Sequence, residues 1–131
     1  MPYESNIKTG LKGEQEITVT PEQSASAVGS GLLDVFATPA MIALMENTAS
    51  STIQPYLSDK ENSVGSEVKI QHIKPTPIGM KVRCECEVID VSGRKITFQV
   101  NAFDEEGEIG KGQHSRFIVD TERFMEKLKK S

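Results

Sequence analysis

The chain has 131 residues, of which 37% are hydrophobic and 26% charged, and its formal net charge is -4. This length and composition predict one globular domain spanning residues 1–131 and exclude a disordered or fibrous protein. Because the basic residues form no stripe and no apolar stretch reaches membrane-spanning length, we expect neither nucleic acid nor a membrane as a partner.

The first residues are polar and lack the basic segment and apolar run of a signal peptide, so we expect a cytoplasmic protein. The first strand is expected over residues 14–20, where Ile17 and Val19 alternate with polar neighbours before Pro21. The small residues at 24–31 follow, and they have neither periodicity nor bulk. This stretch is expected to be a mobile connection.

A long apolar helix is predicted from Thr38 to about residue 53. Thr38 suits the N-cap and Pro39 the first helical position, and apolar residues then recur at helical spacings. Glu46 is the one charged residue between positions 35 and 58. A helix this apolar is normally buried inside a domain.

An antiparallel sheet is predicted after the helix. Alternating apolar residues indicate strands over 64–72, 82–88, 96–102 and about 108–119, with turn residues between them. We therefore expect three consecutive hairpins, then a short helix that packs Phe124, Met125 and Leu128 back on the body. One strand, a long helix and four more strands predict an α+β hotdog fold, in which a curved sheet wraps around one central helix.

The two cysteines, Cys84 and Cys86, lie two residues apart in a predicted strand, where a disulfide between them is awkward. We expect reduced thiols in the core, as in a reducing compartment. A metal site is not expected, because Cys-x-Cys supplies too few ligands.

Two titratable side chains point toward the same layer of this fold. Glu46 has apolar neighbours on the helix, so its carboxylate is expected to be largely desolvated, with either a raised pKa or hydrogen-bonding partners. His72 shares the apolar strand face of Val68 and Ile70 and is expected to point toward the helix. Together they favour acid-base chemistry, although a carboxylate bound by backbone donors and an inert core histidine remain alternatives.

Thr38 has a structural explanation of its own, because threonine is a common N-cap. An N-cap also places a hydroxyl and free backbone N–H groups at the positive end of a helix, where an oxyanion is stabilised. The other histidine, His114, is expected to be structural.

Several short motifs occur in one order along the chain: Phe36-Ala37-Thr38, Met45-Glu46, His72 with Thr76-Pro77, and Gly110, Gly112, His114 and Arg116. Together they resemble the fluoroacetyl-CoA thioesterase-like family of hotdog proteins, over residues from about 11 to 124. The resemblance implies an acyl-CoA thioesterase whose catalytic residues are Thr38, Glu46 and His72.

The resemblance also implies roles for these residues. Glu46 attacks the thioester carbonyl or activates water, His72 polarises the carbonyl or protonates the leaving thiolate, and Thr38 orients the carboxylate. Gly65 and Arg116 correspond to residues near the acyl group. Leu32 and Phe36 are also expected to contact the substrate.

Where the family's fluoroacetyl enzyme has phenylalanines ahead of Phe-Ala-Thr, this chain has Gly29 and Leu32. We therefore expect a different short or medium acyl group. The resemblance further implies a homodimer with CoA along its interface, and the strand at 64–73 is a candidate for self-pairing. Coenzyme A is expected only as part of the substrate, with no other cofactor. A non-catalytic acyl-CoA binding module and a hotdog enoyl-CoA hydratase or dehydratase remain as alternatives.

Overall fold

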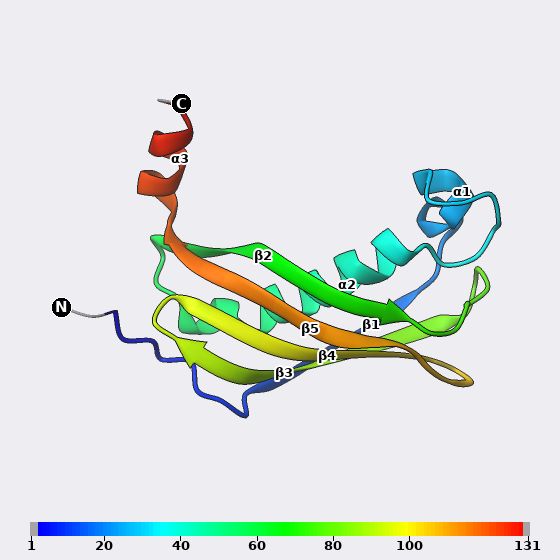
Figure 1. Cartoon of the computed structure of the whole chain (residues 1–131), viewed down its shortest axis with the longest axis horizontal. Helices are drawn as coiled ribbons and strands as arrows, with labels where there is room; N and C mark the ends of the chain where they lie inside the picture. Colours follow the sequence, from blue (N-terminus) through cyan, green and yellow to red (C-terminus); the bar gives the residue numbers. More distant parts are fainter. Residues whose placement is uncertain (1–2, 130–131) are drawn as a thin grey trace.

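A computed structural model describes residues 3–129 and shows one antiparallel sheet wrapped along a long helix (Figure 1). The strands are β1 (Lys12–Thr18), β2 (Glu61–His72), β3 (Lys81–Ser92), β4 (Lys95–Asp104) and β5 (Gly107–Asp120). The helix is α2 (Thr38–Ile53), and the 3-10 turn η2 (Gln54–Tyr56) follows it. The predicted α+β arrangement of one curved sheet and one central helix is confirmed.

The strand order is β1-β3-β4-β5-β2, so β2 lies at one edge of the sheet, next to β5. Among residues 3–129, only β3–β4 and β4–β5 are hairpins, and the prediction of a hairpin between the second and third strands is wrong. The connection at residues 73–80 contains Pro75 and Pro77, which cannot donate to a strand ladder, and it carries the chain to the other side of the sheet. The outer edge of β2 therefore pairs with no other strand among residues 3–129.

A β-bulge interrupts β2 where its register with β5 shifts between Gly65 and Glu67. The extra residue reverses the alternation of side chains along the strand. Gly65 lies opposite Arg116, and Val68 lies opposite His114, so Gly65, Val68 and His72 all face α2. One strand thus presents residues to the helix at both of its ends.

The core lies between α2 and the concave face of the sheet. Its side chains from α2 include Met41, Met45, Ala49 and Ile53, and those from the sheet include Val82, Cys84, Val88, Ile96, Phe98, Val100 and Ile109. Each large apolar side chain buried here contributes about 1.5–3 kcal/mol. The cysteines are buried and free as predicted, and burial raises the pKa of Cys84 to about 11.

The segment between β1 and α2, expected to be a mobile connection, contains the 3-10 turn η1 (Pro21–Gln23) and the short helix α1 (Ala25–Val28). The Ser24 hydroxyl caps α1 by accepting from the Ala27 N–H at 3.2 Å, and Gly29 ends it in a left-handed conformation with φ 77°. Local capping residues thus order a stretch that has no hydrophobic periodicity.

The last helix, α3 (Thr121–Lys129), extends away from the body (Figure 1), and none of its described residues is buried. The expectation that it packs back on the body is wrong. Among residues 3–129, no helix is both long enough and apolar enough to cross a membrane.

Candidate active site

The hydroxyl of Thr38 does not cap α2. The helix begins at Thr38, and Ala37 occupies the N-cap position with no side-chain hydrogen bond, so the predicted N-cap is displaced by one residue. Thr38 Oγ1 instead lies 2.7 Å from Nδ1 of His72 at the end of β2. A hydroxyl that is hydrogen-bonded to an imidazole is available for proton transfer.

His72 is held as a neutral base. Burial lowers the pKa of its imidazole below the ordinary value, and an interaction with the Lys74 backbone opposes part of this decrease. Its Nε2 atom is buried and has no hydrogen-bond partner among the described residues. At neutral pH the ring is therefore unprotonated and able to accept a proton.

A pocket of about 290 Å³ adjoins this pair. Thr38 and His72 line it together with Val35, Phe36 and Ala25. Phe36 and Leu32 are both expected to contact the substrate. Phe36 lines this pocket, whereas Leu32 is 95% exposed and does not.

Glu46 lies apart from Thr38 and His72 in one chain. It follows Thr38 by eight residues, which is about 12 Å along a helix axis. Within residues 3–129 it forms no hydrogen bond or ion pair with either of them. Its side chain is 40% exposed, so the expectation of a largely desolvated carboxylate is wrong for the single chain.

Glu46 instead lies next to Arg116 of β5. Its Oε2 is 4.0 Å from Arg116 Nη1. The guanidinium is buried and fixed by Ser63, since Nε donates to the Ser63 hydroxyl at 2.8 Å and Nη2 donates to the Ser63 carbonyl at 2.9 Å. Burial lowers the pKa of Arg116, and the negative charge of Glu46 opposes this decrease. The result is a fixed cation next to a partly exposed carboxylate.

Gly65 allows this arrangement because it has no side chain. A Cβ at this position would lie 2.6 Å from Glu46 Oε2 and 3.3 Å from Cε1 of His114. The sequence-predicted residues Glu46, Gly65 and Arg116 therefore form one cluster, and Thr38 and His72 form another.

His114 is the residue whose place at this site the sequence does not predict. Its Nδ1 donates to the Glu67 carbonyl at 2.9 Å, so Nε2 carries the lone pair that accepts from Arg116 Nη1 at 3.2 Å. Burial lowers the pKa of His114; Glu67 and Glu46 oppose the decrease, and Arg116 adds to it. A signal does exist in the sequence, because His114 and Arg116 are two residues apart on one strand and share a face.

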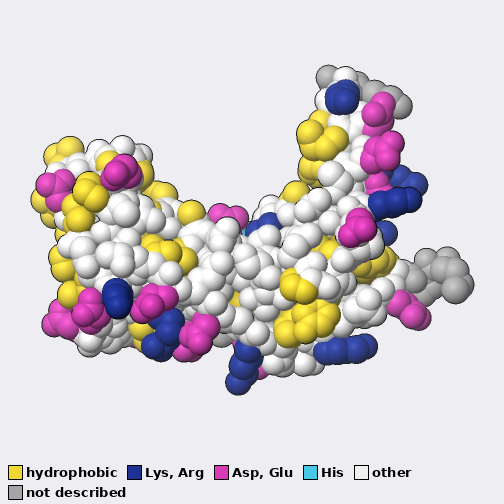
Figure 2. All heavy atoms as spheres, turned by 180° about the vertical axis from the view of Figure 1, so that it is seen from behind, with side chains coloured by type: hydrophobic (Ala, Val, Ile, Leu, Met, Phe, Trp, Pro, Cys, Tyr) yellow, Lys and Arg dark blue, Asp and Glu magenta, His cyan; other side chains and the backbone are white. Residues whose placement is uncertain are grey.

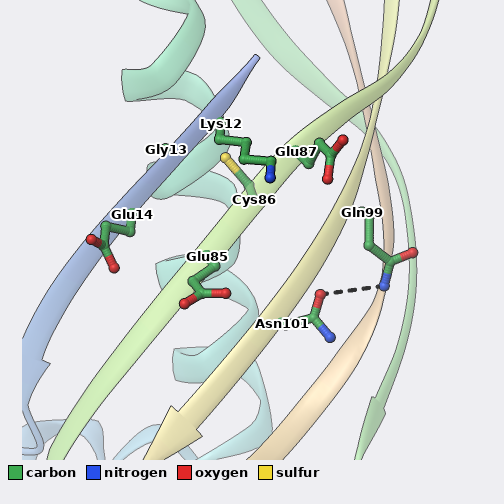
Figure 3. A pocket seen from close by; sticks show the side chains of 8 residues that line it. All are labelled: Lys12, Gly13, Glu14, Glu85, Cys86, Glu87, Gln99 and Asn101. Carbon is green, nitrogen blue, oxygen red and sulfur yellow. Dashed lines mark hydrogen bonds between the residues drawn. The ribbon is translucent and has the colours of Figure 1, made fainter. Parts of the chain in front are cut away.

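A second, open pocket lies elsewhere and is not suited to this chemistry. It is lined by Lys12, Gly13, Glu14, Glu85, Cys86, Glu87, Gln99 and Asn101. Figure 3 shows the β3 and β4 glutamate and amide side chains in front of the sheet, with α2 behind it. Its three glutamates would repel the phosphates of CoA. Among residues 3–129, no group of three or more His, Cys, Asp or Glu side chains is placed to hold a metal ion.

Comparison with known proteins shows similarity to one family of thioesterases. Residues 19–122 match the family of fluoroacetyl-CoA-specific thioesterases. The fluoroacetyl-CoA thioesterase of Streptantibioticus cattleyicolor is 36% identical over 96 residues, covering 73% of this chain and 69% of that protein.

Solved structures show the same fold along nearly the whole chain. A structure of a fluoroacetyl-CoA thioesterase matches with a TM-score of 0.91 and 29% identity, covering 96% of this chain and 98% of that one. A thioesterase superfamily member from Thermus thermophilus matches with a TM-score of 0.86 and 29% identity, covering 95% of this chain and 94% of that one. The chain therefore belongs to the fluoroacetyl-CoA-specific thioesterase family and is a hotdog-fold thioester hydrolase.

Proposed function

We propose that this protein hydrolyses a short or medium acyl-CoA thioester to the free acid and CoA in the cytoplasm, using water and no metal or organic cofactor. The observation that carries the proposal is the 2.7 Å hydrogen bond between Thr38 Oγ1 and His72 Nδ1 beside a small pocket. The two free, buried thiols agree with a reducing compartment.

The proposed chemistry has two steps. His72 Nδ1 takes the hydroxyl proton as Thr38 Oγ1 attacks the thioester carbonyl, and free N–H groups in the first turn of α2 stabilise the oxyanion. The C–S bond breaks and His72 returns the proton to the CoA thiolate. Water, deprotonated by His72, then hydrolyses the acyl-Thr38 ester, which releases the acid and restores the hydroxyl.

The second cluster is proposed to belong to the same site through a homodimer. The outer edge of β2 is unpaired among the described strands, and both ends of β2 face α2. If two copies pair antiparallel at this edge about a two-fold axis near the middle of β2, the Gly65 segment of one strand lies near His72 of the partner subunit. Glu46 and Arg116 would then face the partner's Thr38–His72 pair across the substrate. There Arg116 orients the acyl group, and Glu46 positions the hydrolytic water that His72 deprotonates.

A mixing experiment tests this composite site. Glu46→Ala and His72→Ala should each lose about 10²-fold or more in turnover. After subunit exchange, half of the dimers contain one of each variant, and each of these has one intact site out of two, so about a quarter of the parent activity should return. No recovery would place all of the catalytic residues within one chain.

Thiol release from a panel of acyl-CoAs tests the reaction itself. Release from short chains, unchanged by a chelator, is expected. Mass spectrometry of a quenched reaction should find the acyl group on Thr38, and finding it on Glu46 would assign the nucleophile to the carboxylate instead. Tight binding without release would indicate a binding module, and hydration of enoyl-CoA without thiol release would indicate a hydratase.

A further inference from the structure

Two exposed apolar patches lie at opposite ends of β2. The lid patch follows α1 and consists of Val28, Leu32 and Leu33, of which Leu32 is 95% and Leu33 69% exposed. The arm patch lies on α3 and consists of Met125 and Leu128, which are 48% and 56% exposed. Figure 2 shows both regions rising on either side of a saddle, with the apolar side chains of α3 on the side that faces the saddle.

Neither patch is covered by its own chain. An isolated helix of nine residues is marginal in water, and α3 has no buried residue with which to anchor itself. Exposed apolar side chains that cluster, as Leu32 and Leu33 do with Val28, often mark a surface that meets a partner. Both patches therefore lack an apolar partner.

The positions of the patches identify that partner as a second copy of this chain. Helix α3, called the arm below, begins next to the N-terminal end of β2, where the Thr121 N–H donates to the Lys60 carbonyl at 2.9 Å. The segment that carries the lid patch, called the lid below, lies near the C-terminal end of β2. There the Phe36 N–H donates to the carbonyl of Thr76, which follows β2, at 2.8 Å. The unpaired edge of β2 runs between them (Figure 1). A two-fold axis at the middle of β2 exchanges these ends, so the arm of one copy meets the lid of the other.

We propose that α3 packs its arm patch on the lid patch of the partner subunit and holds that lid over the Thr38–His72 pocket. The inference rests on the β2-paired dimer of the proposed function. The segment that carries the lid patch also reaches the site, because Ala25, Ser30 and Val35 of this segment line the same pocket as Thr38 and His72. The arm of each subunit therefore contributes to substrate retention in the active site of the other subunit.

Cross-linking between two single variants tests the contact. Leu32→Cys and Leu128→Cys proteins are mixed, allowed to exchange subunits and treated with a short bis-maleimide. The native Cys84 and Cys86 are buried and do not compete. A covalent dimer is expected in the mixture and not with either variant alone. Glu126→Cys, on the opposite face of α3, replaces Leu128→Cys in the control and should give no covalent dimer.

The outcomes separate this proposal from the one on which it rests. A sedimenting dimer that releases thiol from acyl-CoA but is not cross-linked would overturn the arm–lid contact and leave the proposed function in place. A monomer at all concentrations would overturn both the contact and the composite site. Thiol release measured on the same samples reports the activity independently.

Kinetics test the effect on the site. Replacing Met125 and Leu128 with serine should raise KM for the acyl-CoA by about tenfold, with unchanged circular dichroism, because both side chains are exposed in the single chain. Glu126→Ser should leave KM unchanged. An unchanged KM in the Met125/Leu128 variant would show that the arm does not hold the lid.

Discussion

The Thr38 hydroxyl is directed at His72 because Ala37, which has no side-chain hydrogen-bonding group, occupies the N-cap of α2. Thr38→Ala should therefore lower turnover by about 10²-fold or more. It should lower the free energy of unfolding by about 1 kcal/mol or less, because the hydrogen bond to His72 is lost but no helix cap is lost. Thr38→Ser keeps the hydroxyl and should retain most of the activity. Thiol release and thermal melting measure both effects; a large loss of stability would show that the hydroxyl supports the helix.

Gly65 should be as sensitive as a catalytic residue although it has no side chain. In Gly65→Ala the new methyl group meets Glu46 Oε2, the flexible end of a side chain, so the carboxylate moves and the fold remains. We expect about tenfold or greater loss of kcat/KM, with less than about 1.5 kcal/mol lost in stability. Adding Gly65→Ala to Glu46→Ala should cause little further loss of activity. Additive losses would mean that Gly65 acts through another group.

The sequence predicts the identity of the site residues better than their grouping. Glu46 and His72 are identifiable because a charged residue in an apolar helix and a histidine on an apolar strand face are both unusual. The separation of Glu46 from His72 within one chain is not predictable, because it depends on how α2 crosses β2. The hydrogen bond from Arg116 to His114 cannot be predicted from the sequence either, because the tautomer of His114 is set by the Glu67 carbonyl on another strand.

At the scale of elements, the bulge in β2 determines which side chains face the helix. Deleting Ser66 should remove the bulge and leave Gly65 opposite Arg116 and Val68 opposite His114, so β2 would lose its local bend and extra twist. The two ends of β2 would then shift relative to each other and to α2. We expect loss of thiol release and a lower unfolding midpoint in urea. Ser66→Ala keeps the chain length and loses only the bond from its hydroxyl to the Ser115 carbonyl, so it should cost about 1 kcal/mol. Normal activity in the deletion variant would show that the bend at the bulge is not needed to place the two ends of β2.

Elements with strong periodicity or clear breakers are predictable, and their pairing partners are not. The limits of α2 follow from the Thr38-Pro39 start and the apolar run to Ile53. The pairing of β2 with β5 cannot be seen in local sequence, because it depends on where residues 73–80 lead. The position of α3 is set by the direction in which β5 ends, and an amphipathic pattern alone cannot show on what its apolar face packs.

For the whole molecule, the histidines predict how stability depends on pH. His72 and His114 both have a pKa below the ordinary value because both are buried, so below about pH 6.5 the unfolded chain binds more protons than the folded one. The free energy of unfolding should therefore fall as the pH drops from 7 to 5. A protonated His114 would also repel Arg116, whose Nη1 is 3.2 Å from His114 Nε2.

His114→Gln provides the matched variant for this prediction. A glutamine oxygen can accept from Arg116 without titrating, so this variant should lose less stability between pH 7 and pH 5 than the parent. Its kcat/KM at pH 7 should stay closer to that of the parent than the value for His114→Phe, which leaves Arg116 Nη1 without its acceptor. Urea unfolding and thiol release at several pH values measure these effects. If the free energy of unfolding depends on pH equally in the parent and in His114→Gln, His114 does not contribute to this pH dependence.

The open edge of β2 also affects the protein before any substrate is present. The outer edge of the twelve-residue strand β2 pairs with no other described strand. Any extended chain can add there, including misfolded copies of the same protein. If two copies pair at this edge as proposed, self-association would protect a newly made chain from aggregation as well as complete its active site. Variants that weaken assembly should precipitate at concentrations where the parent stays clear, even when their catalytic residues are intact.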